Sequence, residues 1–134
     1  MDPQLLKDNF AQVAKHGDDV AAYFYADLFE RDPALRRMFP AAMDKQREML
    51  LAALSHIVSV ADDLGELVPF LQDLGRRHQG YGVTEDQYPT VGASLISTLR
   101  YFSGPAWDAS VENNWAEAYT VVSQVMREAA AGQS

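Results

Sequence analysis

The stretch RRHQGYGVTEDQYPTVGASLISTL, residues 76–99, contains the end of one predicted helix, a glycine-rich turn and the start of another helix. The glycines of the QGYGV segment suit a sharp change of direction, because glycine adopts backbone angles that other residues avoid. Thr84 followed by Gln87 is a capping-box pattern, and it predicts a helix that runs from there to near Gly104. The stretch thus indicates two successive helices with a short connection.

The same start and stop signals recur along the rest of the chain. Asp2 and Pro3 begin a first helix that Gly17 ends, and Pro33 ends a second helix by Asp32. No segment alternates convincingly between apolar and polar residues, so strands are not expected. The other predicted helices cover residues 34–39, 44–63, 66–78 and 108–131, with a break at Gly65 and with Pro69 in a first turn. We therefore predict an all-α chain that forms a single domain over residues 1–134.

The composition excludes several classes of site and partner. The chain has no cysteine, which rules out disulfides, iron–sulfur clusters and thiolate ligands to a metal. The 19 acidic residues outnumber the 11 basic ones, so nucleic acids and anionic membrane surfaces are poor partners. The start, MDPQLLKDNF, is unlike a secretory leader, and no apolar stretch is long enough to cross a bilayer. We expect a cytoplasmic protein.

Four predicted helices each carry one polar residue on an apolar face. At about 100° per residue, positions separated by about 4, 7 and 11 residues share a face of a helix. The four faces are Leu67, Leu71, Leu74 and His78; Gln46, Leu50, Ala53 and Ile57; Ala21, Tyr25 and Leu28; and Tyr88, Val91, Leu95 and Leu99.

One pocket explains all four polar residues if a flat, apolar cofactor with a metal centre lies between the helices that carry Gln46 and His78. A haem iron held by one neutral imidazole keeps a position open for a diatomic gas, and Tyr25 and Gln46 are suitable hydrogen-bond donors to it. The alternative is a helical bundle in which these polar groups pair with one another in the core. Spacing alone leaves both interpretations open.

The three histidines differ in their suitability as a metal ligand. His16 lies at a predicted helix C-terminus, where an imidazolium interacts favourably with the helix dipole, and His56 lies about 120° from the apolar arc of its helix. His78 alone ends an apolar stripe. It follows Arg76 and Arg77, whose charges suit cofactor carboxylates but equally suit the last turn of a helix. His78 is therefore the best candidate ligand.

Four segments resemble the globin domains of bacterial flavohaemoglobins and the single-domain bacterial haemoglobins. They are AYFYADLFERDPALRRMFP at 22–40, KQREMLLAAL at 45–54, the stretch at 76–99, and NWAEAYTVVSQV at 114–125. The resemblance covers nearly the whole chain and implies a globin fold of six to eight helices around a haem pocket. It also allows the chain to be the N-terminal domain of a longer flavohaemoglobin-like protein.

The resemblance implies roles for particular residues. His78 matches the axial ligand of a haem b iron, and Tyr88 matches its neighbour on the same side. Tyr25 matches the donor to the iron's gas ligand, with Gln46 beside it, and Phe39 matches a ring that packs on the porphyrin. The residues expected to contact the haem are Phe39, Leu50, Ala53, Leu74, Arg77, His78, Tyr88 and Val91, and those expected to act on the ligand are Tyr25 and Gln46.

Two departures from the family bear on activity. The family usually has a glutamate at the position of Ala130, and Glu128 lies two residues too early to replace it. A carboxylate there strengthens electron donation by the axial histidine, so its absence weakens the expectation of strong oxygen activation. The second departure is that flavohaemoglobins continue into a reductase module, and no nucleotide-binding fingerprint is found in this chain.

The resemblance implies that ferrous haem in this chain binds O2, NO or CO. If a flavin and NAD(P)H reductase is supplied, as a further domain or as a separate partner, the resemblance implies dioxygenation of nitric oxide to nitrate. Without an electron source the chain manages at most one turnover. A stand-alone oxygen carrier or store, and a haem sensor of gases, are the alternatives.

Overall fold

The computed structural model describes residues 1–132, and over these residues the chain is entirely helical. The absence of any strand in this part confirms the all-α prediction. The α-helices are α1 (Pro3–Ala14), α2 (Asp18–Arg31), α3 (Asp44–Ser59), α4 (Leu64–Gly80), α5 (Tyr88–Ser103) and α6 (Ala109–Ala131). Short 3-10 helices are η1 (Pro33–Met38), η2 (Glu85–Gln87) and η3 (Gly104–Ala106).

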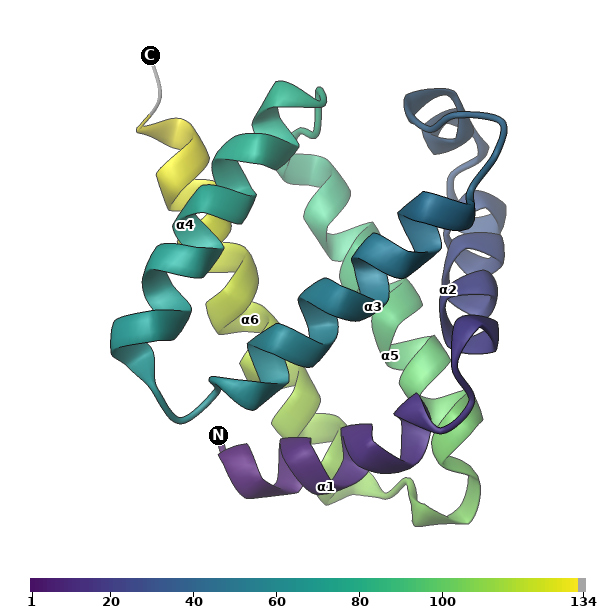
Figure 1. The fold of residues 1–134 in the computed structure, drawn as a ribbon, viewed down its shortest axis with the longest axis vertical. Coiled ribbons are helices and arrows are strands. Elements are labelled where there is room, and N and C mark those ends of the chain that lie inside the picture. Colours follow the sequence, from purple (N-terminus) through teal and green to yellow (C-terminus); the bar gives the residue numbers. More distant parts are fainter. Residues whose placement is uncertain (133–134) are drawn as a thin grey trace.

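The helices form two packed pairs that α1 joins (Figure 1). α4 packs on α6, α2 packs on α5, and α1 crosses below α3, α5 and α6. α3 packs on α1 and α2 but not along α4, and the two helices diverge from the turn that connects them. α3 and α4 therefore do not bury their facing sides against each other. None of the helices within residues 1–132 has the length and hydropathy that crossing a membrane requires.

Several predicted helix starts are confirmed in detail. The Asp2 carboxylate accepts two backbone N–H groups of α1, at 3.0 and 3.2 Å, and the Asp108 carboxylate accepts one of α6, at 2.9 Å. The backbone N–H of Thr84 donates to the Gln87 side chain at 3.0 Å, as part of the predicted capping box. Gly17 has a φ of 58°, the left-handed conformation expected after a helix end. Side-chain caps thus set the starts at Asp2, Thr84 and Asp108, whereas Gly17 acts through its backbone conformation.

α3 is shorter than predicted, because it ends at Ser59 and not at residue 63. Residues 60–63 form a tight turn that is closed by hydrogen bonds such as Asp63 N–H to the Val60 carbonyl, at 2.9 Å. Val60 and Ala61 are buried although they lie in this turn. The apolar pattern therefore continues past the end of the helix.

α4 begins earlier than predicted, and it contains Gly65, where a break was expected, as well as Pro69. It starts at Leu64, so the break predicted at Gly65 is wrong. Gly65 lies in the first turn, where backbone N–H groups lack a helical acceptor in any case. Pro69 lies in the second turn and not the first, and it removes the N–H that would bond to the Gly65 carbonyl. Pro69 is exposed and α4 continues to Gly80, so the helix tolerates this loss.

Buried side chains form two clusters. The larger one joins α1, α2, α5 and α6 around residues such as Phe10 and Trp115. The smaller one lies mainly between α4 and α6, around Leu71 and Met126. Val58 is the one residue of α3 that is buried. α3 is therefore the least anchored of the α-helices in the described chain.

α4 and α6 cross closely at Gly75. A Cβ atom at Gly75 would lie 2.3 Å from the carbonyl oxygen of Met126 and 2.7 Å from its Cα. Only a residue without a Cβ atom permits this approach. The crossing fixes α4 against α6 three residues before His78.

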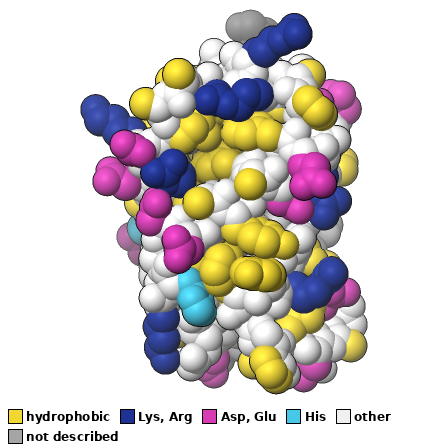
Figure 2. Space-filling model, turned by 90° about the vertical axis from the view of Figure 1, so that its right-hand side faces the viewer, with side chains coloured by type: hydrophobic (Ala, Val, Ile, Leu, Met, Phe, Trp, Pro, Cys, Tyr) yellow, Lys and Arg dark blue, Asp and Glu magenta, His cyan; other side chains and the backbone are white. Residues whose placement is uncertain are grey.

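Aromatic side chains also gather at the surface, where the start of α2 meets the end of α5. Tyr23 and Tyr101 stack with their ring centroids 4.6 Å apart, and Phe102 lies edge-on to Tyr101 at 5.0 Å. His16 is exposed and its ring lies 5.0 Å from that of Phe102. Figure 2 shows hydrophobic side chains beside a histidine on this side of the molecule. His16 is thus a surface residue, as predicted.

Candidate functional site

Tyr25 of α2 and Gln46 of α3 meet through a hydrogen bond. The Gln46 Nε2 donates to the Tyr25 hydroxyl oxygen at 3.3 Å. Burial raises the pKa of the Tyr25 phenol above its usual value, and the hydrogen bond from Gln46 acts in the opposite direction. The phenol therefore stays protonated at neutral pH. Because Gln46 uses the hydroxyl oxygen, the hydroxyl hydrogen is left to donate to another acceptor.

Aromatic rings surround this hydrogen bond. The ring centroids of Phe29 and Phe39 lie 5.9 and 5.5 Å from that of Tyr25, and 5.4 Å from each other. Arg36 holds the end of η1 in place, because its guanidinium donates to the Phe39 carbonyl at 3.2 Å and to the next two carbonyls. The Tyr25 hydroxyl is thus set in an apolar, aromatic enclosure that includes Phe39.

His78 lies on α4, near its C-terminal end. Its Nδ1 is 2.8 Å from the carbonyl oxygen of Leu74, one turn earlier. A carbonyl oxygen only accepts, so Nδ1 carries the proton and Nε2 carries the lone pair. Burial lowers the pKa of His78, the bond to Leu74 raises it by less, and nearby Arg77 lowers it further. His78 is therefore a neutral imidazole at neutral pH, and the lone pair of its Nε2 is available to an acceptor such as a metal.

The apolar residues predicted to lie near Gln46 and His78 are only partly buried. Leu50 on α3 packs against the larger core cluster, and Leu74 on α4 packs against the smaller one. The half-buried predicted residues are Leu50 and Ala53 on α3, Leu74 on α4 and Val91 on α5. The facing sides of α3 and α4 thus keep apolar surface that the protein itself does not fully cover.

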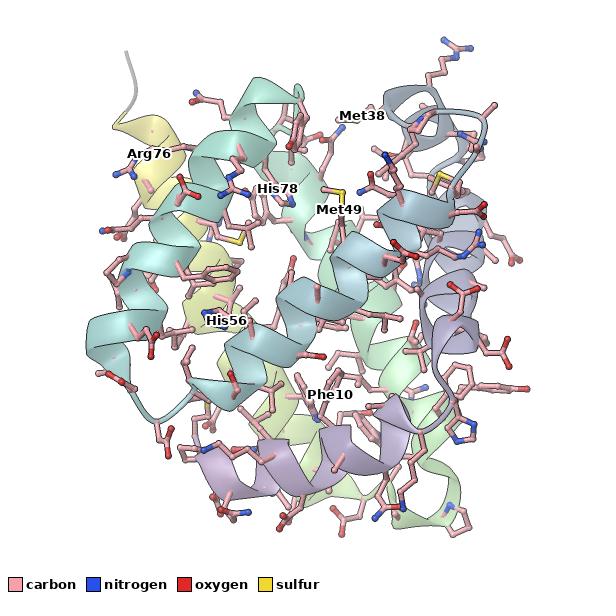
Figure 3. The ribbon with its side chains drawn as sticks, viewed as in Figure 1. Phe10, Met38, Met49, His56, Arg76 and His78 are labelled. Atoms are coloured by element: carbon pink, nitrogen blue, oxygen red, sulfur yellow. The ribbon has the colours of Figure 1, made fainter. Side chains whose placement is uncertain are left out.

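Met49 belongs to the same region, and the sequence interpretation did not single it out. Its side chain is 53% exposed. Figure 3 shows Met49 on α3 and His78 on α4 facing the same region. Met49 lies three residues after Gln46 and four before Ala53, which is the spacing of one helical face. This spacing was the signal in the sequence that identifies Met49 as a further candidate for contact with an apolar cofactor.

Tyr88 and Arg77 lie at the margins of this region. Tyr88 is buried in the smaller cluster, and its backbone carbonyl accepts a hydrogen bond from the Tyr119 hydroxyl at 2.6 Å. Arg77 is exposed, and its guanidinium pairs with Asp73 on the same helix at 2.5 Å. Arg77 is therefore engaged with its own helix, on the solvent side of α4.

His56 does not join this group of residues. It is half-buried and its ring lies 4.5 Å from that of Phe70, which agrees with the predicted flank position. In Figure 3, His56 lies near the lower end of α3, whereas His78 lies near the upper end of α4. Within residues 1–132, no group of three or more His, Asp or Glu side chains is arranged to hold a metal ion.

Similarity to known proteins falls within one family. The sequence profile of the globin family matches residues 22–126. A flavohemoprotein of Halalkalibacterium halodurans is 28% identical over 125 residues, which are 91% of this chain and 30% of that protein. Neuroglobin of Danio rerio is 31% identical over 143 residues, with 93% of this chain and 87% of that protein covered. This chain therefore spans under a third of the flavohemoprotein and most of the neuroglobin.

A solved structure shares the whole fold. It is an engineered carbene transferase from Rhodothermus marinus, described as a candidate nitric oxide dioxygenase. The TM-score is 0.85 at 25% sequence identity, and the match covers 96% of this chain and 90% of that one. The arrangement of helices described above is thus one that a known globin-type protein adopts.

Proposed function

Because this chain belongs to the globin family, which implies a haem cofactor, we propose that it binds haem b through His78 and takes O2, NO or CO as ligand. Haem, when bound, supplies an iron centre with an open position for such diatomic gases. The observation that carries the proposal is the bond from His78 to Leu74, because it leaves Nε2 of a neutral imidazole as a metal ligand.

The chemistry of the other residues fits a haem. His78 offers one neutral imidazole, which suits an iron whose remaining ligands belong to a macrocycle. Leu50, Ala53 and Leu74 present apolar side chains that are only partly covered by protein, and Met49 is more exposed still. Burial of this surface by a flat apolar group is favourable. The donor set and the uncovered apolar surface thus support the same cofactor.

The residues on α2 and α3 control the gas ligand. The Tyr25 hydroxyl would donate its free hydrogen to a gas ligand held in this enclosure. Gln46 holds the Tyr25 oxygen and so orients this hydrogen. Phe39 and Leu50 exclude water from the ligand, which strengthens the hydrogen bond by lowering the local polarity.

We propose further that the chain is the globin domain of a nitric oxide dioxygenase system. One molecule of NO, one of O2 and one electron give one nitrate ion, so turnover needs a reductant. The chain is similar to two flavohemoproteins and covers 31% and 30% of their lengths. A flavin and NAD(P)H reductase, as a further domain or a separate protein, is the proposed source of electrons.

The similarity to a neuroglobin favours a second function. The two chains match over most of both lengths, at 31% identity. A chain that acts alone binds gas reversibly, as a carrier, a store or a sensor. Nitrate formation distinguishes the functions: with NO, O2, NADH and a flavin reductase, repeated turnover supports the dioxygenase, whereas at most one nitrate per protein favours the second function.

His78→Ala tests the haem ligand directly. We expect the purified variant to lose the Soret absorbance of histidine-ligated haem, because no other histidine is placed to replace His78. His56→Ala is the matched control, since His56 packs on Phe70 away from His78, and this variant should keep the normal spectrum. An unchanged spectrum in His78→Ala would exclude His78 as the ligand.

A further inference from the structure

A cavity lies at the C-terminal end of α4, next to the last turns of α6. It has a volume of about 400 Å3 and is formed by the end of α4, the turn that follows, the start of α5 and the end of α6. Cavities of roughly 300–1,000 Å3 are the usual size of small-molecule sites. Its apolar lining includes Val83, Tyr88 and Ala130.

Arg127 brings a positive charge to this cavity. Its Nε donates to the Ser123 carbonyl at 3.2 Å, one turn earlier on α6. Within residues 1–132 its guanidinium forms no ion pair, and its two terminal NH2 groups have no hydrogen-bond acceptor. Arg127 is half-buried, so these unused donors are partly removed from water. Such a group favours an anion that accepts two parallel hydrogen bonds.

Tyr88, which lines the cavity together with Arg127, is held by Tyr119. The Tyr119 hydroxyl donates to the Tyr88 carbonyl, and the Tyr119 ring lies so close to α5 that a Cβ atom on Gly92 would be 2.5 Å from it. Burial raises the pKa of the Tyr88 phenol, and the positive charge of Arg127 opposes this effect. The start of α5 thus contributes a packed aromatic side chain to the cavity that contains Arg127.

We propose that this cavity binds a small organic monocarboxylate, with its carboxylate on Arg127 and its apolar body against Val83, Tyr88 and Ala130. The single guanidinium matches one carboxylate. Glu85 also lines the cavity, and its negative charge disfavours ligands with a second anionic group. Ala130 occupies little space, which leaves room for the body of the ligand.

The cavity adjoins the proposed haem site, because Tyr88 lines the cavity and is also an expected haem contact. The rest of the lining comes from the end of α4, the turn that follows and the end of α6, and it contains no residue of α3 and does not include His78. Arg127 is not among the residues proposed to hold haem. Loss of benzoate binding in Arg127→Gln and loss of the Soret absorbance in His78→Ala are therefore separate results, and the two proposals fail separately.

The test uses benzoate as the probe, titrated into the purified full chain. Where haem is present, the protein is reduced and saturated with CO, so that benzoate has no open position at iron. We expect saturable binding by calorimetry, with chemical-shift changes at the Arg127 Nε–H and the Tyr88 ring in NMR spectra. Benzyl alcohol, which has the same ring without the charge, should bind at least ~10-fold more weakly, because hydrogen bonds to charged groups contribute roughly 1.5–3 kcal/mol.

Two variants separate a carboxylate site from general affinity for an apolar cavity. Arg127→Gln should weaken benzoate binding ~10-fold or more. Ala130→Glu places a tethered carboxylate three residues from Arg127 on α6, and it should abolish benzoate binding by occupying the guanidinium. Arg37→Gln, on exposed η1, removes one positive charge elsewhere and should leave the affinity unchanged.

The outcomes decide the proposal even if one variant fails to fold. Loss of binding in Arg127→Gln or Ala130→Glu, with normal helical content and with Arg37→Gln unaffected, supports it. No saturable binding to the unmodified chain, or equal affinity in a folded Arg127→Gln or Ala130→Glu, would overturn it. Equal affinity for benzoate and benzyl alcohol would also overturn it, because the carboxylate would then contribute nothing.

Discussion

At the scale of single residues, the hydrogen bond from Gln46 determines which atom of the Tyr25 hydroxyl is free to bind a ligand. Gln46 donates to its oxygen, so the Tyr25 hydroxyl hydrogen is available for a gas ligand. Tyr25→Phe removes this donor and changes little else, because Phe fills the same aromatic enclosure. One such hydrogen bond contributes ~1 kcal/mol or more. We expect oxygen to dissociate several-fold faster from the variant, as measured by rapid mixing with CO.

The companion variant Gln46→Leu distinguishes direct donation from orientation. It keeps the Tyr25 hydroxyl but removes the group that holds its oxygen. A smaller acceleration than in Tyr25→Phe indicates that Gln46 orients the phenol. An unchanged oxygen dissociation rate in Tyr25→Phe would mean that the Tyr25 hydroxyl does not reach the ligand.

Individual residues also show where sequence reasoning succeeded and where it stopped. The helical spacing singled out Tyr25, Gln46 and His78, because a polar group on an apolar face is visible in one dimension. Spacing allowed the polar groups to pair with one another, but it did not identify Gln46 and Tyr25 as a pair, since this contact joins residues from two helices. It also did not reveal Arg127, which on a helical face resembles any solvated arginine. Its lack of an ion-pair partner within residues 1–132 depends on the tertiary fold.

At the level of helices and turns, the boundaries set by side-chain caps were predictable and those set by packing were not. Asp2, Asp108 and the pair of Thr84 and Gln87 act through local hydrogen bonds, so their sequence patterns suffice. The end of α3 depends on burial of Val60 in a turn, which leaves the apolar pattern unbroken. Local chemistry therefore predicts where helices begin better than where they end.

The crossing of α4 and α6 supplies a prediction about a whole helix. Gly75→Ala places a Cβ atom 2.3 Å from a backbone oxygen of α6, so one of the two helices must move. Overpacking of this kind costs about 1–3 kcal/mol. We expect a loss of this size in the free energy of unfolding, measured with denaturant, and faster haem loss because α4 carries His78.

Gly65→Ala in the same helix is the control for this variant. A Cβ atom there meets the Asp63 side chain at 3.5 Å, an ordinary contact distance. Its stability should equal or slightly exceed that of the unmodified chain, since alanine favours the helix. Equal stability of Gly75→Ala and Gly65→Ala would contradict the tight crossing.

Across the whole molecule, the proposed haem would cover apolar side chains on α3 and α4 that protein side chains leave partly exposed. Two protein clusters stabilise α1, α2, α4, α5 and α6 against one another, whereas α3 contributes only Val58 to the buried residues. α3 and α4 also lack mutual packing along their length. Uncovered apolar side chains such as Leu50 and Met49 lie on α3. The stability of α3 should therefore depend on the cofactor more than that of any other helix.

Removal of haem tests this distribution of stability. A ligand that binds only the folded state stabilises it by RT ln(1 + [L]/Kd), about 4 kcal/mol at a thousand times Kd. Local opening takes place where few apolar contacts hold an element. We expect hydrogen exchange in the haem-free protein to accelerate most in α3 and in the last turns of α4 around His78. α5 should change least, because six of its residues, including Leu99, are buried by the protein itself. If hydrogen exchange accelerates equally in α3 and α5, haem stabilises the fold only globally. If the exchange rates of α3 are the same with and without haem, the cofactor lies elsewhere.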